Sequence, residues 1–258
     1  MSRVAFITGA SSGLGAGLAR RLARSGFAVA LAARRRDRLD EVAGAVRAAG
    51  GTALPLVCDV REQDQVRAAV AAAVAALGPV DLLVANAGVS GMTRAEDLSS
   101  RSIEDVMRTN FLGPVYAAEA VLPSMLERRS GHLVAVGSLA GYGGLPKTAA
   151  YSASKGALHN FFESLRLDLR GTGVDVTVIT PGYVKTELTA KNIYRMPFLL
   201  ELDDAVERMV RGIERRDALV AFPLPLFGLA WMAQILPASI YDWIGGRVRR
   251  EKREEAGP

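Results

Sequence analysis

Short apolar runs alternate with longer helical patterns along this chain, and the alternation limits the folds that it can adopt. Seven runs predict strands, at residues 4–7, 27–33, 53–57, 81–85, 133–136, 174–179 and 219–222. Helical patterns separate the first four runs, at residues 15–25, 37–49 and 63–77. Continuously apolar runs indicate strands covered on both faces, and strand–helix–strand succession predicts parallel neighbours. We therefore expect one α/β domain with a doubly wound, seven-stranded parallel sheet.

Composition and residue counts narrow the class further. The chain has 258 residues, 50% hydrophobic and 23% charged, which excludes a disordered chain or a disulfide miniprotein. Cys58 is the only cysteine, and His132 and His159 lack metal-ligand spacing, so we expect no metal site. The net charge is +5, but the arginines are scattered, which disfavours a nucleic-acid partner. The run at 4–7 is too short for a signal peptide, and we expect a cytoplasmic protein.

A glycine-rich segment follows the first predicted strand and opens the next helix. Residues 8–15 have a TGxxxGxG spacing. Glycines at such a turn let backbone N–H groups approach a pyrophosphate at the positive end of a helix. Glycines also mark ordinary turns, but the position between strand and helix favours a dinucleotide site. The candidate contacts are Gly9, Ser11, Ser12, Gly13, Leu14 and Gly15.

The end of the second predicted strand bears on the choice between the two nicotinamide dinucleotides. A dinucleotide fold often places an acid there, about 20 residues after the loop, for the adenosine ribose. Here the strand is followed by Arg34, Arg35 and Arg36, with no acid. Guanidinium groups suit a 2′-phosphate, so Arg34 and Arg35 favour NADP(H) over NAD(H). The alternative is that these arginines only begin a solvated helix.

Tyr151 and Lys155 lie four positions apart at the start of a predicted helix and therefore share one helical face. A nearby ammonium group stabilises a phenolate, so we expect the tyrosine pKa below its usual value of about 10. Such a tyrosine can exchange a proton with a ketone or an alcohol near neutral pH. Ser138 closes the fifth predicted strand, where its hydroxyl can hydrogen-bond a substrate carbonyl.

In order, these motifs resemble those of the short-chain dehydrogenase/reductase family, in its single-domain branch of about 250 residues. The matching motifs are residues 8–15, Asp59, residues 86–88, Asn110, Ser138, Tyr151 with Lys155, Pro181 with Gly182, and Thr186. The resemblance implies a Rossmann-type domain at residues 1–222 that binds NADP(H) and carries the catalytic residues. Residues 223–258 would be an apolar and basic extension of that domain.

The resemblance also implies a role for each residue. Tyr151 would be the general acid/base, Lys155 would bind the nicotinamide ribose, Ser138 would orient the carbonyl, and Asn110 would hold a proton relay through backbone and water. The implied reaction interconverts a ketone and a secondary alcohol with NADPH. The remaining cofactor contacts would be Asp59 and Val60 at the adenine, Asn86, Ala87 and Gly88 at the fourth strand, and Pro181, Gly182, Val184 and Thr186 near the nicotinamide. Asn86 and Thr186 could also be plain turn, loop or capping residues.

The C-terminal part carries the expectations for the substrate. Residues 189–200 mix basic and apolar side chains, and they either close over an apolar substrate or form an ordinary surface loop. Residues 218–241 carry no charge, but their three prolines argue against one membrane-spanning helix. We expect instead a strand, a proline turn and an apolar helix at about residues 226–236.

Trp231 and Trp243, followed by Arg247, Arg249 and Arg250, suit a membrane interface. We therefore consider peripheral contact with the inner membrane through residues 223–250, beside a subunit contact or a lid over the active site. An apolar tail favours a lipophilic carbonyl of acyl, sphingoid or steroid type.

Two other functions stay open at this point. One is a 3-oxoacyl-thioester reductase of fatty-acid type. The other is a protein that senses NADP(H) without catalysis, which the presence of both Tyr151 and Lys155 disfavours. The resemblance implies a small-molecule carbonyl or alcohol substrate and a homodimer or homotetramer.

Overall fold

The structure, a computed structural model, describes the backbone of residues 2–190 and 196–254, with side chains up to residue 246. It confirms the predicted α/β class, because seven parallel strands form one sheet in the order β3-β2-β1-β4-β5-β6-β7. The strands are β1 (Arg3–Thr8), β2 (Phe27–Ala33), β3 (Ala53–Val57), β4 (Val80–Ala85), β5 (Gly131–Val136), β6 (Val174–Pro181) and β7 (Leu219–Phe222). All seven predicted strands are present, with ends shifted by no more than two residues.

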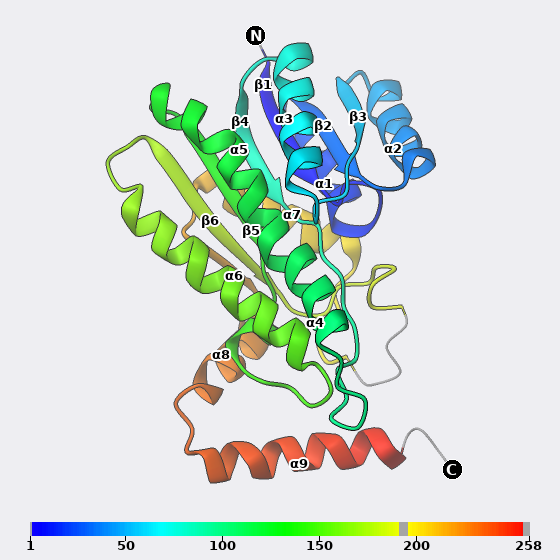
Figure 1. The fold of residues 1–258 in the computed structure, drawn as a ribbon, viewed down its shortest axis with the longest axis vertical. Helices are drawn as coiled ribbons and strands as arrows, with labels where there is room; N and C mark the ends of the chain where they lie inside the picture. Colours follow the sequence, from blue (N-terminus) through cyan, green and yellow to red (C-terminus); the bar gives the residue numbers. More distant parts are fainter. Residues whose placement is uncertain (1, 191–195, 255–258) are drawn as a thin grey trace.

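Helices cover both faces of the sheet (Figure 1). One face carries α1 (Gly13–Arg24), α2 (Arg36–Ala48) and α7 (Leu202–Arg215), and the other carries α3 (Gln63–Leu77), α5 (Gly113–Glu127) and α6 (Ala149–Asp168). The short α4 (Ser100–Met107) precedes α5. The helices predicted at residues 15–25, 37–49 and 63–77 correspond to α1, α2 and α3, and the helix predicted to start at Tyr151 corresponds to α6. The alanine-rich α3 shows how the sequence sets the bounds, because it stops at Gly78, whose φ of +101° suits glycine.

Alternate residues of each strand enter different hydrophobic cores. In β1, Ala5 and Ile7 pack toward α1 and α2, whereas Val4 and Phe6 pack toward α3 and α5. All four are at most 1% exposed. Burial of an aliphatic or aromatic side chain contributes about 1.5–3 kcal/mol, so the two cores hold the sheet rigidly from both sides.

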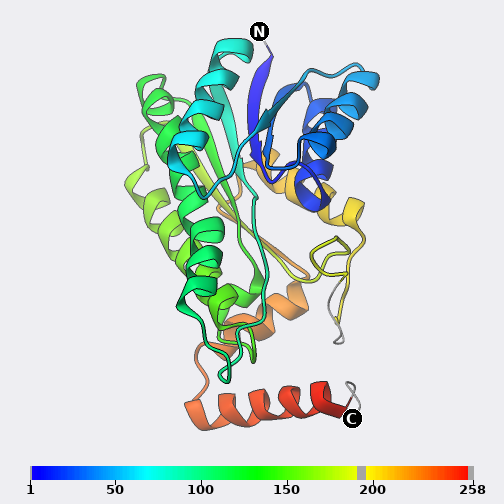
Figure 2. The same ribbon diagram turned by 45° about the vertical axis from the view of Figure 1, so that its right-hand side comes forward.

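The order of the strands reverses between β1 and β4, which are neighbours in the sheet. Strands β2 and β3 extend the sheet on one side, and β5, β6 and β7 extend it on the other. In open α/β sheets, ligands bind outside the carboxyl ends of the strands at such a switch point. The segments that follow β1, β4, β5 and β6 lie together at this end of the molecule (Figure 2).

Two further helices, α8 (Leu224–Ala233) and α9 (Ala238–Glu254), follow β7 at the carboxyl end of the sheet (Figures 1 and 2). The apolar helix predicted at residues 226–236 exists, but its bounds are wrong. Pro225 lies in the first turn, where its missing N–H is not needed, and Pro237 disfavours helix in the residue before it. The start of α9 at Ala238 was not predicted.

Along the described segments, no helix combines the length and the apolar character that a membrane span requires. The side chains of Arg247, Arg249 and Arg250 lie outside the described residues, as do residues 191–195 of the predicted substrate loop.

Candidate active site

A cavity of about 730 Å³ lies along the carboxyl edge of the sheet. It runs from the glycine-rich loop, past Tyr151, to the inner faces of α8 and α9. All of the predicted site residues line it except Gly15 and Asn110. The sheet therefore gathers side chains from residues 9–186 of the chain into one space.

The glycine-rich loop is shaped as a close-fitting cradle at the N-terminus of α1. Gly9 and Gly13 have φ values of +66° and +52°, in the region that favours glycine. Gly15 lies beneath the loop, where an added Cβ would be 2.3 Å from the carbonyl oxygen of Gly9. The backbone can thus approach a pyrophosphate at the positive end of the helix, as a dinucleotide requires.

Asn86 and Thr8 fix the shape of this loop. The side-chain amide of Asn86 donates to the carbonyl oxygens of Thr8 and Gly9, at 3.0 and 3.3 Å. The hydroxyl oxygen of Thr8 accepts from the backbone N–H groups of Asn86 and Ala87, both at 3.0 Å. These bonds join the carboxyl ends of β1 and β4 across the switch point.

Arg35 extends from the end of β2 over the glycine-rich loop. Its Nη2 donates to the hydroxyl oxygens of Ser11 and Ser12, at 3.3 and 2.8 Å, and its Nη1 donates to Glu187 at 3.1 Å. Arg34 also lines the cavity, and both side chains are exposed. Two guanidinium groups and two hydroxyls, the chemistry that suits a phosphate, therefore lie together beside the glycine-rich loop.

Asp59, predicted at the adenine, lines the same part of the cavity but is paired within the protein. Its carboxylate accepts from Nε and Nη2 of Arg61, with a shortest distance of 2.7 Å. This guanidinium lowers the pKa of Asp59 below its ordinary value, so the carboxylate is charged at neutral pH.

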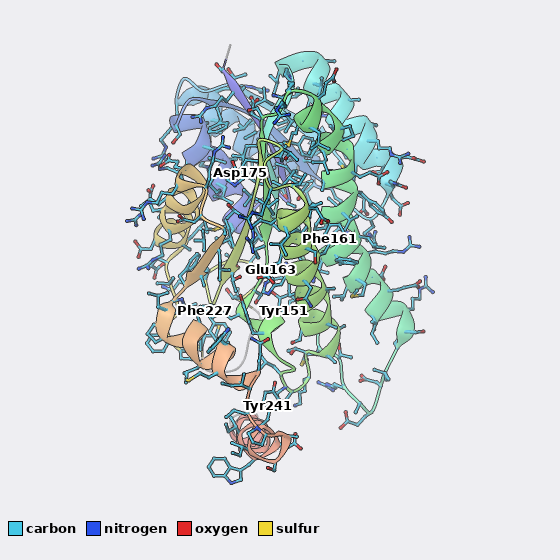
Figure 3. All side chains as sticks on the ribbon, turned by 90° about the vertical axis from the view of Figure 1, so that its left-hand side faces the viewer. Tyr151, Phe161, Glu163, Asp175, Phe227 and Tyr241 are labelled. Carbon is cyan, nitrogen blue, oxygen red and sulfur yellow. The ribbon has the colours of Figure 1, made fainter. Side chains whose placement is uncertain are left out.

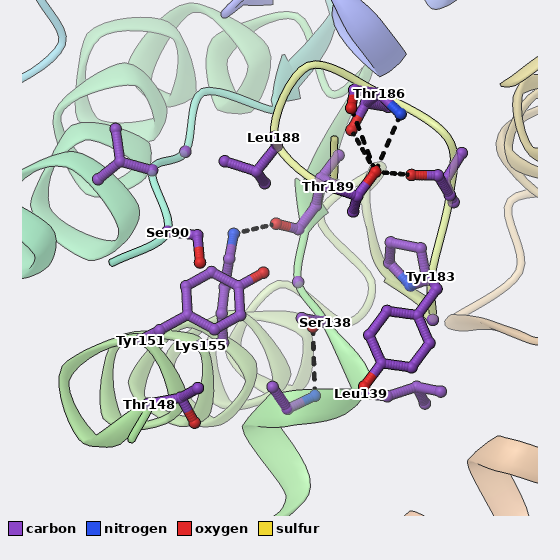
Figure 4. A pocket seen from close by; sticks show the side chains of 18 of the residues that line it. Ser90, Ser138, Leu139, Thr148, Tyr151, Lys155, Tyr183, Thr186, Leu188 and Thr189 are labelled. Atoms are coloured by element: carbon purple, nitrogen blue, oxygen red, sulfur yellow. Dashed lines mark hydrogen bonds between the residues drawn. The ribbon is translucent and has the colours of Figure 1, made fainter. Parts of the chain in front are cut away.

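Tyr151, Lys155 and Ser138 point into the same space at the centre of the cavity (Figure 4). Tyr151 and Lys155 lie one turn apart on α6, and Ser138 follows β5 directly. The hydroxyl oxygen of Ser138 accepts from the N–H of Ala140 at 3.2 Å. Because the oxygen accepts this bond, its hydroxyl hydrogen can be donated to a carbonyl oxygen.

Lys155 is deeply buried, with 4% of its surface exposed. Its ammonium donates to the carbonyl oxygen of Val136 at 2.7 Å, which directs it along the end of β5. Burial lowers the pKa of Lys155 from 10.5 to about 8. The lysine thus carries most of its positive charge at neutral pH beside Tyr151.

Asn110 lies behind the cavity wall and is fully buried. Its amide exchanges two hydrogen bonds with the backbone of Val89, at 2.8 and 2.9 Å, and donates to the hydroxyl of Ser154 at 3.0 Å. The surrounding residues, Arg108–Leu112, form a π-helical turn between α4 and α5. Asn110 thereby ties the segment after β4 to the helix that carries Tyr151.

His159, for which the sequence predicted no metal-binding role, contacts Ser138 beside Tyr151 and Lys155. It lies eight positions after Tyr151 and four after Lys155, on the same face of α6. Its Nε2 accepts from the backbone N–H of Ser138 at 3.3 Å, and its ring packs on Tyr142 with centroids 5.0 Å apart. Helical periodicity alone could have indicated this placement.

The substrate side of the cavity is largely apolar. It is lined by Leu139, Leu145, Leu226, Leu229, Ala230, Ala233, Leu236 and Ile244, with the hydroxyls of Tyr183 and Tyr241 among them. The sequence indicated neither tyrosine, nor Glu187, because contacts between segments that are distant along the chain leave no local signal. In the predicted loop at 189–200, Thr189 and Pro197 line the cavity, and Phe198 is 54% exposed.

The fold and this constellation define a class, the dinucleotide-binding oxidoreductases of doubly wound topology. Among the described residues, no cluster of three or more His, Cys, Asp or Glu is arranged to hold a metal ion. The glycine cradle, the groove beyond it and the buried lysine fit a nicotinamide dinucleotide, which supplies or accepts a hydride in such proteins.

Comparison with known proteins identifies the family. The profile of the family described as short chain dehydrogenase matches residues 3–195. An uncharacterized oxidoreductase of Myxococcus xanthus is 50% identical over 247 residues, which cover 96% of this chain and 98% of that protein. Ketoacyl reductase HetN of Nostoc sp. is 34% identical over an alignment that covers 98% of this chain and 93% of that protein. The chain belongs to the short-chain dehydrogenase/reductase family.

A solved structure agrees with this assignment. The crystal structure of an actinorhodin polyketide ketoreductase with NADPH has a TM-score of 0.82 and 32% sequence identity. The structural alignment covers 88% of this chain and 97% of the ketoreductase chain. The protein is thus an oxidoreductase of a family that uses NAD(P)(H).

Proposed function

We propose that the protein is an NADP(H)-dependent reductase that interconverts a lipophilic ketone and its secondary alcohol. One observation carries the proposal: a single cavity joins the glycine-rich loop and Arg35 to Tyr151, Lys155 and Ser138, and then to the apolar faces of α8 and α9. The predicted division into a domain at residues 1–222 and an extension at 223–258 belongs to this proposal.

In the direction of reduction, NADPH held by the glycine-rich loop and Lys155 would supply the hydride that the carbonyl carbon accepts. Tyr151 donates its phenolic proton to the carbonyl oxygen, which completes the alcohol. The hydroxyl of Ser138 donates to the same oxygen and fixes its position. Lys155, held by Val136, binds the nicotinamide ribose and favours the ionised form of Tyr151. Asn110 supports the relay that returns a proton to Tyr151.

Arg34 and Arg35 support the choice of NADP(H), because no acid competes for the ribose at the end of β2. We assign the adenine to Asp59 and Val60. The remaining contacts proposed for the cofactor are Gly9, Ser11, Ser12, Gly13, Leu14, Gly15, Asn86, Ala87, Gly88, Pro181, Gly182, Val184 and Thr186. Asn86 acts through the shape of the loop that it holds.

The apolar lining supports an acyl, sphingoid or steroid-like carbonyl. Reduction of a 3-oxoacyl thioester is the second candidate, and the names of the Nostoc ketoacyl reductase and the polyketide ketoreductase favour it. A protein that only senses NADP(H) would not need both Tyr151 and Lys155. We further propose a homodimer or homotetramer in the cytoplasm, in peripheral contact with the inner membrane through residues 223–250.

The proposal is tested by NADPH and NADH oxidation with ketones graded by chain length and polarity, and with a 3-oxoacyl thioester. We expect faster turnover with NADPH, a rate that rises with apolar length, and a loss of 10²-fold or more in Tyr151→Phe, on the order that general acid catalysis contributes. Full turnover by Tyr151→Phe contradicts the mechanism. A strong preference for small polar ketones contradicts the substrate class.

A further inference from the structure

Exposed apolar side chains gather at the end of the molecule where the cavity opens. Eight of them belong to α8, α9 and the short connection between the two helices, and they are 43–72% exposed: Leu224, Leu229, Trp231, Met232, Ile235, Ile240, Trp243 and Ile244. The loop after β4 adds Met92 and Leu98, which are 66% and 67% exposed. Figures 1 and 2 place this loop beside α9. An apolar surface of this kind marks a site of interaction.

The helix α8 is apolar on every side. Leu226, Ala230 and Ala233 recur at helical spacing and line the cavity, whereas Leu224 and Trp231 are exposed. The helix has no charged residue, and none of its residues is buried. A helix that is apolar all round is normally enclosed by a protein core or by lipid. Its outer face therefore requires a partner of low polarity.

The helix α9 contributes to the wall of the cavity. The hydroxyl of Tyr241 donates to the carbonyl oxygen of Gly144 at 2.6 Å, which ties α9 to the loop before α6. Figure 3 shows Tyr241 at the same end of the molecule as Tyr151 and Phe227. Tyr241 and Ile244 line the cavity, and Ile244 is also 43% exposed, so a partner that covers α9 lies next to the cavity.

The charge pattern of this segment matches a lipid surface. Residues 218–241 carry no charge, whereas residues 247–255 contain five Lys or Arg and three Glu, a net charge of +2. An uncharged segment followed by a cationic one suits the boundary between hydrocarbon and anionic headgroups. Trp231 and Trp243 are the only tryptophans of the chain, and tryptophan favours this depth.

We infer that this end of the molecule docks on an anionic lipid bilayer, with the outer faces of α8 and α9 in the interface and the cavity mouth toward the lipid. A lipophilic carbonyl then reaches Tyr151 from the bilayer without crossing water. The entry of the substrate rests on the proposed reductase function, but the docking itself does not.

Vesicle flotation of the full chain tests the docking, with phosphatidylcholine alone and with phosphatidylcholine plus phosphatidylglycerol. We expect stronger binding to the anionic vesicles, and quenching of Trp231 and Trp243 fluorescence by brominated lipid. The double variant Trp231→Ser/Ile235→Ser should lose partitioning by about tenfold or more, since it removes two inserted side chains. Val74→Ser/Leu167→Ser is the control, because both residues are exposed (42% and 57%) but lie at the amino end of the sheet.

Turnover separates the docking from the reaction. On a water-soluble ketone, Trp231→Ser/Ile235→Ser should match the unaltered chain, and on a ketone carried in vesicles it should be at least tenfold slower. Turnover without vesicle binding contradicts the docking but agrees with the reductase function. Vesicle binding without turnover on any ketone contradicts the reductase function but agrees with the docking. The inference is wrong if the chain does not bind vesicles and light scattering shows that the double variant has fewer subunits than the unaltered chain. The apolar surface then joins copies of the chain.

Discussion

Arg35 donates a hydrogen bond to Glu187 across the cofactor groove, with Nη1 and Oε2 3.1 Å apart. Arg35 follows β2, whereas Glu187 belongs to the loop after β6, so the pair joins the two walls of the groove. The neighbouring guanidinium lowers the pKa of Glu187 below its ordinary value. The carboxylate of Glu187 would compete with a 2′-phosphate for Arg35, so we expect the two residues to affect NADPH binding in opposite directions.

Arg35→Ala should weaken the binding of NADPH and leave the binding of NADH nearly unchanged. It removes charge-assisted hydrogen bonds worth about 1.5–3 kcal/mol, so KM for NADPH should rise about 10–100-fold while KM for NADH changes little. Initial rates with each cofactor measure the effect. Arg36→Ala is the matched control, because Arg36 pairs with Asp40 on the exposed side of α2. Equal losses with both cofactors would show that Arg35 does not read the 2′-phosphate.

Glu187→Gln should have the opposite effect. Without its carboxylate, Arg35 loses a competing partner and a phosphate meets less repulsion, so KM for NADPH should fall several-fold at low salt. Glu201→Gln serves as the comparison, since Glu201 pairs with Lys185 in the same loop region. An unchanged KM in Glu187→Gln, at every salt concentration, would count against a role in cofactor choice.

His159 should position Ser138 for the reaction. In His159→Leu the buried N–H of Ser138 loses its acceptor, which costs about 1–3 kcal/mol, and kcat should fall about tenfold with KM for NADPH unchanged. In His159→Gln an amide oxygen can take the place of Nε2, and much of kcat should return. If both variants unfold more easily but keep full kcat, the histidine only supports the fold.

Acid should destabilise the protein before its carboxylates titrate. Burial lowers the pKa of His132 and His159 from 6.5 to about 4. The unfolded chain therefore binds more protons between pH 6.5 and pH 4, so the stability that these neutral histidines provide is complete above pH 6.5 and is lost as the pH falls.

The loss should be on the order of 2–3 kcal/mol per histidine in the free energy of unfolding, by the usual conversion of a pKa difference. Denaturant titrations at pH 7, 5.5 and 4.5 measure it, with His132→Gln/His159→Gln as the reference. The double variant should lose less stability than the unaltered chain over this range. An equal loss in both would assign the acid sensitivity to other groups.

The sequence predicted the sheet well because its strands are uniformly apolar. The run at residues 27–33 matches β2 at both ends, since every residue of that strand is buried. The same signal cannot describe contacts between segments. The π-helical turn at Arg108–Leu112 depends on bonds from Asn110 to Val89 and Ser154, which the local pattern does not contain.

The site was predicted where motif residues follow strands, and missed where loops meet. The fixed spacing of Tyr151 and Lys155 on one helix turn indicated their proximity, and the cavity contains both. Glu187 reaches the cavity from the loop after β6 and Tyr241 reaches it from α9, and only the tertiary structure brings them there. The roles of all these residues stay predictions for the experiments above.

The side-chain amide of Asn86 makes the shape of the glycine-rich loop depend on two parts of the chain. The loop lies in the part that contains β1, β2 and β3, but its donor comes from the part that begins with β4. A fragment that ends before Val80 would keep every glycine of the loop, yet it would leave the carbonyls of Thr8 and Gly9 to water and β1 as a bare sheet edge. We therefore expect nucleotide binding only when the two complementary fragments are mixed and reassemble.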